Sequence, residues 1–237
     1  MFKKVAADAL GLSDLGTIIK PQDYDKVDSD DYVMHEEQEK VYFLIKSKAD
    51  EYCFTNKALI HVDGTSAMSK KRTLKRYDYF NNPINAVVLE TAGNMDRDVE
   101  IKFKVGEEYY SIDVDKRQIE QLKDLYKALL RIAIIQEENA KLLKYAAGSL
   151  NTAAASVTRT INSASGEEQF KAINQYAFDW MKQAHEAYIR KDFSDVFEKF
   201  INNWQIEFMA FNEFVEFRSF RSDNGPFYLT RSWSVMG

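Results

Sequence analysis

The sequence predicts an α+β protein in which about seven antiparallel strands are followed by a long helix and then by a helical hairpin. Residues 41–114 consist of short segments with strand-like patterning, and residues 115–145 repeat apolar residues every three or four positions. Two more amphipathic segments follow, over residues 165–190 and 192–220. The connections between the predicted strands are too short for crossover helices, so the strands must be antiparallel.

The clearest strand pair covers residues 99–105 and 109–114. Apolar residues alternate with charged or polar ones in "VEIKFKV" and in "YYSIDV", which is typical of strands with one buried and one solvated face. The intervening "GEE" at residues 106–108 favours a hairpin between them.

Five further strands precede this pair. "KVYFLIK", "EYCFT" and "ALIHVDG" are rich in aromatic and branched residues and are separated by "SKAD" and "NK", a pattern that predicts a meander. The basic segment "SKKRTLKRYDY" at residues 69–79 and "INAVVLE" at residues 84–90 supply the other two. Because neither face of the basic segment is apolar enough to be buried, we expect this strand at an edge of the sheet.

A long helix is predicted directly after the last strand, over residues 116–145. Asp115 and Gln118 have the spacing of a capping box, and apolar residues recur on one side of the helix that follows. This predicted stripe comprises Ile119, Leu122, Tyr126, Leu129, Leu130 and Ala133.

Small residues dominate the next segment, "AAGSLNTAAASVTRTINSASG", which is typical of a linker or of a loosely packed Ala-rich helix. We therefore expect two domains, residues 1–146 and 147–237. The second contains two amphipathic helices whose apolar faces are too broad to be buried on each other alone. These faces must meet the first domain or another subunit. The predicted interface residues are Trp180, Phe197, Phe200, Trp204, Phe208 and Phe211.

Composition limits the possible partners and compartments. The formal net charge of -5 argues against a general nucleic-acid binder, because such proteins depend on many cationic contacts to phosphate. The single cysteine, Cys53, cannot form an internal disulfide. No window approaches the roughly 18–20 apolar residues that a spanning helix needs. We therefore expect a cytoplasmic protein whose membrane contact, if it has any, is peripheral.

The residues that usually carry catalysis do not converge in this sequence. The three histidines stand apart at positions 35, 61 and 185, and His61 is expected to be a solvent-facing or hydrogen-bonded strand residue. Cys53 is expected to be a small core residue. The sequence contains no phosphate-binding glycine loop, nucleophile elbow or metal-spaced cysteine set. We predict a protein that is not an enzyme and uses no cofactor or metal.

The segments "DEYCFTNKALIHVDG", "KKRTLKRYDY", "LETAG", "DVEIKFK" and "SIDVDKRQIEQLKDLYKALL" occur in this order along the chain. Together they resemble the bacterial pleckstrin-homology (PH) domain family over roughly residues 1–130. The two aromatic helices resemble the YvbH-like oligomerisation region over about residues 148–210.

This resemblance implies a PH-like split barrel of seven antiparallel strands in two nearly orthogonal sheets, capped by the long helix and followed by an α-helical hairpin. It also implies ring-shaped homo-oligomers, with a five-fold ring as the expected form. It implies no biochemical activity.

Eukaryotic PH domains bind phosphoinositides mostly through basic residues in the loop between the first two strands. Here that loop, "SKAD", ends in Asp50 and is followed by Glu51, so the lipid-binding role is not carried over by position. The basic residues lie instead in a later run that comprises Lys70, Lys71, Arg72, Lys75 and Arg76.

A run of opposite charge lies within residues 21–39. It comprises Asp23, Asp25, Asp28, Asp30, Asp31, Glu36, Glu37 and Glu39. Three uses of the basic run are open: protection of a sheet edge against aggregation, contact with the acidic run of a neighbouring subunit, and binding of anionic lipid or nucleic acid.

The patterns predict a non-catalytic interaction and oligomerisation module, and the resemblance implies that it forms a ring-like homo-oligomeric scaffold. The alternative is peripheral binding of anionic membrane lipid through the basic edge strand. A second copy of the chain is the expected partner, another protein or an anionic membrane surface are further candidates, and nucleic acid is not expected.

Overall fold

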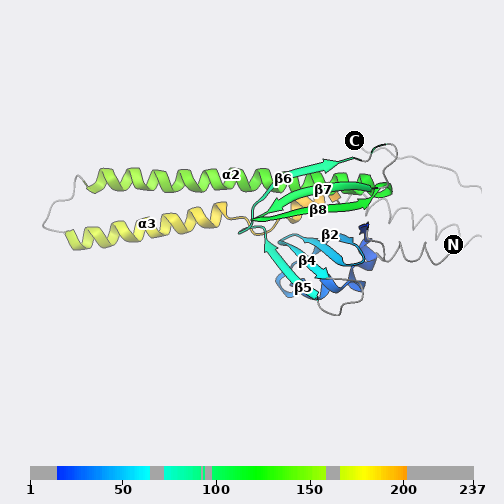
Figure 1. The fold of residues 1–237 in the computed structure, drawn as a ribbon. Helices are drawn as coiled ribbons and strands as arrows, with labels where there is room; N and C mark the ends of the chain where they lie inside the picture. Colours follow the sequence, from blue (N-terminus) through cyan, green and yellow to red (C-terminus); the bar gives the residue numbers. More distant parts are fainter. Residues whose placement is uncertain (1–14, 65–71, 92, 94–97, 159–165, 202–237) are drawn as a thin grey trace, which may run out of the picture. The chain divides into compact units, whose positions relative to one another are not determined.

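The computed structural model of the chain describes residues 15–64, 72–91, 93, 98–158 and 166–201. Within them, two antiparallel sheets are followed by the helices α2, α3 and α4 (Figure 1). The five-stranded sheet has the order β1-β2-β3-β4-β5 and contains Thr17–Ile18, Val41–Lys46, Asp50–Thr55, Ala58–Gly64 and Arg72–Asp78. The three-stranded sheet, β6-β7-β8, contains Ile84–Glu90, Asp98–Val105 and Glu108–Asp115. The seven predicted strands are confirmed.

The predicted alternation of β7 and its hairpin to β8 are confirmed as well. Val99, Ile101, Phe103 and Val105 of β7 are at most 2% exposed, and they face the core between the two sheets. Gly106 follows with a φ of +59°, which glycine adopts without strain. The glycine of "GEE" therefore makes the turn that the sequence predicts.

A strand that the patterning did not predict, β1, links the two sheets. Thr17 and Ile18 pair with β2, while the backbone of Gly16 bonds to β8, from Gly16 N to Asp113 O (2.9 Å) and from Asp115 N to Gly16 O (3.1 Å). A Cβ atom at position 16 would lie 2.7 Å from Asp113 O, so glycine permits this approach. Two paired residues are too few to show a strand period in the sequence.

The acidic run folds onto one face of the five-stranded sheet. It forms three short 3-10 helices, η1 (Pro21–Lys26), η2 (Asp28–Tyr32) and η3 (His35–Glu37). Apolar residues between the carboxylates pack on sheet residues in a cluster of Ile19, Tyr24, Val27, Val33, Leu44, Cys53 and Ile60. The segment is therefore a covering layer of its own domain, which explains why β2, β3 and β4 are buried on both faces.

Helix α2 (Ile119–Thr158) follows the short helix η4 (Lys116–Gln118) and packs its first half against the three-stranded sheet. The predicted stripe is confirmed at Leu122 and Leu129, which are fully buried, and is wrong at Leu130, which is 39% exposed. One residue along a helix turns by about 100°, so Leu130 points away from the sheet that buries Leu129. The other fully buried residues of this face are Leu125, Ala128 and Ile132.

The predicted capping box at the start of this helix is not formed. The Asp115 side chain accepts a hydrogen bond from Arg117 N at 2.8 Å. Gln118 instead uses both of its side-chain groups on Ile18, accepting from Ile18 N at 2.8 Å and donating to Ile18 O at 3.1 Å. Gln118 therefore ties the start of the helix to β1, a contact between residues 100 positions apart.

Helix α2 continues without a break through the Ala-rich segment to Thr158. The expected boundary at residue 146 thus lies within a helix, as the high helix propensity of alanine allows, and the division into two domains stays a prediction. Helix α3 (Gly166–Tyr188) runs antiparallel beside this part of α2 (Figure 1). We call residues 137–158 of α2, together with α3, the arm.

Helix α4 (Ser194–Ile201) follows α3 and packs against α2 and β2. It begins the second predicted amphipathic segment, whose residues 202–220 lie outside the described part of the chain. The two sheets and the helices α2, α3 and α4 belong to one compact unit.

Candidate interaction surfaces

Strand β5 lies at an edge of the five-stranded sheet, as expected, and carries three of the predicted basic residues. Lys70 and Lys71 lie outside the described residues. Each of the three has a carboxylate partner in the same chain: Arg72 Nη2 lies 3.9 Å from Asp28 Oδ2, Lys75 Nζ lies 3.4 Å from Asp63 Oδ2, and Arg76 pairs with Glu39 and Asp78. The charge on the described part of this strand is therefore balanced within the chain.

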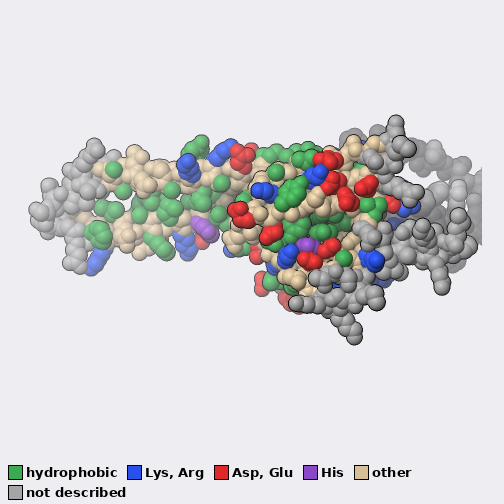
Figure 2. Space-filling model, in the orientation of Figure 1, with side chains coloured by type: hydrophobic (Ala, Val, Ile, Leu, Met, Phe, Trp, Pro, Cys, Tyr) green, Lys and Arg blue, Asp and Glu red, His purple; other side chains and the backbone are tan. Residues whose placement is uncertain are grey.

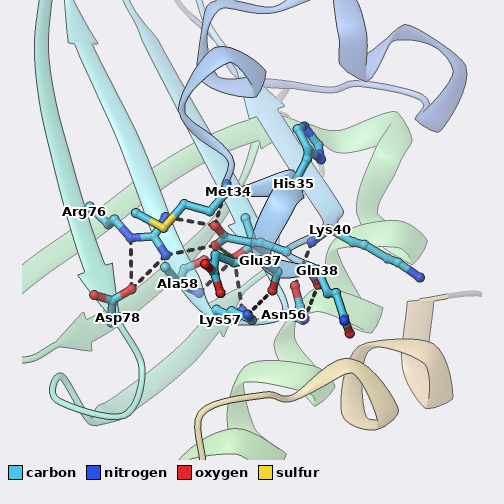
Figure 3. Close-up of polar contacts among 12 residues, drawn as sticks. Met34, His35, Glu37, Gln38, Lys40, Asn56, Lys57, Ala58, Arg76 and Asp78 are labelled. Atoms are coloured by element: carbon cyan, nitrogen blue, oxygen red, sulfur yellow. Dashed lines mark hydrogen bonds and ion pairs between the residues drawn. The ribbon is translucent and has the colours of Figure 1, made fainter.

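The strongest of these contacts joins Arg76 to Glu39, and Figure 3 shows Arg76 directed towards Asp78, its second partner. The guanidinium donates to both carboxylate oxygens of Glu39 at 3.1 Å and also, through Nε, to Asp78 Oδ1 at 2.9 Å. Glu39 is 1% exposed and also accepts hydrogen bonds from Thr55 Oγ1 and Met34 N. Burial alone would raise the pKa of Glu39, but the bonds from Arg76, Thr55 and Met34 outweigh it and lower the pKa.

Other acidic residues of the run are distributed between local pairs and solvent. Asp23 pairs with Lys26 at 2.6 Å, and Asp30 pairs with His35 at 3.2 Å. The carboxylates that face solvent include those of Asp25, Asp31, Glu36 and Glu37. Contact of the acidic run with the basic run of a neighbouring subunit stays a prediction, and within this structure the two runs already meet in one chain.

A second polar cluster lies around His61, which is 6% exposed. Its Nε2 is 3.0 Å from Asp50 Oδ1, its Nδ1 is 3.4 Å from the Tyr110 hydroxyl, and its ring stacks on Tyr52 at 4.5 Å. Burial raises the pKa of Tyr110, so its phenol stays neutral at physiological pH. His61 is thus a hydrogen-bonded strand residue that joins the two sheets.

Cys53, on β3, is fully buried between the five-stranded sheet and its covering layer. Burial raises the pKa of the thiol, so the reactive thiolate is disfavoured at neutral pH. Among the residues that the structure describes, no three His, Cys, Asp or Glu side chains are grouped so that they could hold a metal ion. Over the same residues, no helix has both the length and the apolar character needed to cross a membrane.

Helix α4 is held on the sheets by aromatic packing. Phe197 stacks on Tyr42 with ring centroids 5.3 Å apart, and Phe193 meets Tyr79 edge to face at 5.9 Å. The Tyr42 hydroxyl donates to Glu198 Oε1 at 2.9 Å. All of these rings lie in the interior, since Phe193, Phe197 and Tyr79 are at most 1% exposed. We call Tyr42, Tyr79, Phe193 and Phe197 the docking cluster.

Polar contacts fix the residues that precede α4. Phe193 N donates to Asn56 O at 2.8 Å. The Asn56 side chain donates to Asp192 Oδ2 at 2.6 Å and accepts from Lys40 N at 2.8 Å. Asp192 in turn accepts from Ser194 N at 2.8 Å. The turn between β3 and β4 therefore anchors the end of the arm to the first domain.

The residues of the predicted helical interface do not share one environment, because α4 packs into its own chain. Phe197 is fully buried within its own chain, so it is not a surface residue, and Phe200 is half-buried. Trp204, Phe208 and Phe211 lie outside the described residues. Trp180, on α3, is 37% exposed, and its contact with another subunit stays a prediction. The periodicity indicated apolar faces, but it could not show what covers each of them.

The arm carries apolar side chains that the chain itself leaves exposed. On the face in view in Figure 2, hydrophobic side chains follow the arm, and charged side chains gather over the sheets. Ala184 is the sole buried residue among the described side chains of α3, and none between residues 136 and 155 of α2 is buried. The exposed large apolar residues of the arm are Leu142, Tyr145, Phe170, Tyr176, Phe178 and Trp180.

Two antiparallel sheets followed by a helix that packs on the second sheet define a PH-like fold, here with a helical arm attached. Residues 9–133 match the family model of the bacterial PH domain, and residues 144–203 match that of the YvbH-like oligomerisation region. The chain belongs to the bacterial PH domain family and carries a YvbH-like oligomerisation region. The resemblance proposed from the sequence is confirmed.

Two relatives show how far this similarity extends. The uncharacterized protein YvbH of Bacillus subtilis strain 168 is 61% identical over 204 residues, which cover 86% of this chain and 100% of that protein. The crystal structure of a PH domain containing bacterial protein from Exiguobacterium sibiricum 255-15 is 50% identical, with a TM-score of 0.73. That match covers 80% of this chain and 100% of the other.

The docking cluster was missed by reasoning from the sequence. Phe193 and Phe197 are four residues apart, which indicates one helical face, but Tyr42 and Tyr79 lie in the first domain with no shared pattern. The broad aromatic face of residues 192–220 was the one indication in the sequence. It had to be buried against the first domain or against another subunit, and the sequence did not show which.

Proposed function

We propose that the chain is a non-catalytic interaction module whose PH-like domain is carried in a homo-oligomeric scaffold assembled through the arm. The observation that carries this proposal is the set of large apolar side chains left exposed on the arm, all of which except Leu142 lie within the residues that match an oligomerisation region. Large apolar side chains exposed on a pair of helices favour burial against another molecule.

A ring remains part of the proposal. In this ring, carboxylates of η1, η2 and η3 that face solvent would meet the basic run of the neighbouring subunit in a head-to-tail contact. Such a heterologous contact closes into a ring when the rotation between subunits allows it. Five subunits is the expected number, and other proteins bound by the scaffold would use the surfaces left free.

The mass of the native full-length protein tests this function. We expect an oligomer, and we expect its mass to fall when residues 147–179 are replaced by a short Gly/Ser loop. Trp180 Nε1 lies 3.2 Å from Ala146 O, so a short loop can join these ends and leave the docking cluster in place. Light scattering coupled to gel filtration gives both masses. A wild-type monomer at all concentrations, or a shortened variant of unchanged subunit number, would contradict the proposal.

Binding to anionic membranes gives a separate prediction. Because Arg72, Lys75 and Arg76 already pair with carboxylates of the chain, we expect little binding to vesicles containing phosphatidylserine, even at low salt where surface attraction is strongest. Co-sedimentation measures this, with neutral phosphatidylcholine vesicles as the control. Strong binding that disappears on charge reversal of Lys71 and Lys75 would instead support the membrane alternative.

A further inference from the structure

The edge of β5 that faces away from β4 is open for pairing with another strand. Among the described residues, the sheet ends at β5 on this side, and β5 pairs with β4 at every position from Arg72 to Asp78 without a register shift. The free edge of β6, in the other sheet, is interrupted by a bulge, where Ala86 has a φ of +51°, and bulges hinder the addition of a strand. The first residues of β5, Arg72 to Leu74, are exposed. Strand β5 therefore offers the more regular free edge.

The backbone groups that face this edge follow from a hydrogen bond at the end of the strand. Tyr79 N donates to Lys57 O at 2.9 Å, and these two residues continue the register of β4 and β5. Successive residues of an antiparallel pair bond alternately to the partner strand and to the other side. Counting back along β5, the N–H and C=O groups that point away from β4 are those of Arg72, Leu74 and Arg76.

Apolar side chains lie beside these outward backbone groups. Leu74 is 45% exposed and lies on the same face of the sheet as Arg72 and Arg76, because side chains alternate along a strand. Met34, between η2 and η3, is 49% exposed, and Figure 3 shows its side chain extending towards Arg76. A residue placed opposite Leu74 on an added strand would therefore lie on partly apolar surface.

The charges of β5 select among the strands that could pair with it. Arg72 lies 3.9 Å from Asp28 and Lys75 lies 3.4 Å from Asp63, and both distances exceed the roughly 2.7–2.9 Å of a charge-assisted hydrogen bond. These two cations can therefore attract a further carboxylate. Like charges placed opposite each other destabilise a sheet, so the β5 edge of a second copy is repelled and an acidic segment is favoured.

We propose that the edge of β5 binds an extended acidic segment of another protein as an added antiparallel strand, with an apolar residue opposite Leu74 and carboxylates next to Lys75. Strand addition draws its affinity from main-chain hydrogen bonds and its specificity from alternate side chains, and this edge supplies both. A lipid headgroup has no strand to add, so the low vesicle binding expected above is unaffected. This inference rests on the proposed interaction module and specifies its partner.

Two methylated peptides test the inference on the full-length protein. The probe is a short, fluorescently labelled peptide in which valine alternates with glutamate. With a valine opposite Leu74, the valine N–H groups face β5 and the glutamate N–H groups face solvent. We expect methylation of the valine nitrogens to raise the dissociation constant on the order of 10-fold or more through lost hydrogen bonds, and methylation of the glutamate nitrogens to change it about two-fold at most. Fluorescence anisotropy measures the constants.

A protein variant and a map of the bound region complete the test. Leu74→Pro removes an N–H that β4 does not use, and proline is tolerated at such positions of edge strands. Circular dichroism should therefore show an unchanged fold, and the peptide should no longer bind. If Leu74→Pro loses the fold, the two methylated peptides decide alone. Hydrogen exchange measured by mass spectrometry should slow in residues 72–78 when the unmethylated peptide is added, and should not change in residues 84–90.

The outcomes separate this inference from the proposed scaffold. Equal weakening by the two methylations, equally tight binding of a peptide of alternating valine and lysine, or protection outside β5 would overturn the strand addition. An oligomer that does not bind the valine and glutamate peptide overturns it and leaves the scaffold, whereas a monomer that binds this peptide overturns the scaffold alone. A peptide that binds and lowers the oligomer mass supports the strand addition and shows that the subunit contact uses the same edge.

Discussion

Arg76→Ala lowers the free energy of unfolding by about 3–5 kcal/mol, which is the usual cost of leaving a buried charge without its partner. The Glu39 carboxylate is 1% exposed and would lose two hydrogen bonds from the guanidinium. Thr55 and Met34 would still donate to it, but neither carries a charge. Urea unfolding monitored by circular dichroism measures the difference from the wild-type protein.

Lys75→Ala is the matched control on the same strand. Lys75 lies 3.4 Å from Asp63, but both side chains are about a third exposed, at 37% and 36%, so the expected loss is at most about 1 kcal/mol. An equal decrease in unfolding free energy for the two variants would show that the buried Arg76–Glu39 pair stabilises the fold no more than an exposed pair does.

The destabilisation by Arg76→Ala should shrink in acid. In the wild-type protein the pKa of Glu39 is below its ordinary value of 4.5, so its contribution to stability is present above that value and is lost as the pH falls through the lowered pKa. In the variant, burial without the guanidinium raises the pKa of Glu39 instead. Protonation then relieves the buried charge, and the two unfolding free energies should converge as the pH falls. A gap that widens in acid would contradict this account.

Phe197→Ala is expected to cost about 3–5 kcal/mol of unfolding free energy, as for other large aromatic residues in protein cores. The fully buried Phe197 ring fills the space next to Tyr42 and Tyr79, and α4 is too short to be stable without this packing. Hydrogen exchange of the α4 amides should rise together with the loss of stability. The half-buried neighbour Phe200 is the control, and Phe200→Ala should cost clearly less.

The oligomer mass of Phe197→Ala distinguishes the two roles that its sequence pattern allows. Because Phe197 is inside its own chain, we expect the folded variant to keep the wild-type mass. Dissociation of a variant that remains folded would show instead that Phe197 contacts a neighbouring subunit.

Much of the fold could be predicted because it depends on local patterns. In β7, buried residues alternate with partly buried or exposed ones over the whole strand, and the glycine of its turn has the positive φ that the turn needs. By contrast, β1 pairs through two residues and has no period to detect. Gln118 had the spacing of a capping residue, but its two hydrogen bonds to Ile18 depend on a segment that only the folded chain brings near.

The candidate interaction surfaces were predicted only in part, because they too depend on contacts between segments that are distant in the sequence. The sequence by itself determined the strand order, the long helix, the opposite charges of the two runs and the need of the aromatic helices for a partner. The tertiary structure decided which partners meet: Arg76 pairs with Glu39, 37 residues away, Phe197 enters the core, and Tyr176 stays exposed. Periodicity records which side of an element is apolar or charged, whereas burial depends on the distant segment that packs there. Folding thus paired the described basic residues of β5 with carboxylates of the same chain and left large apolar side chains of the arm exposed.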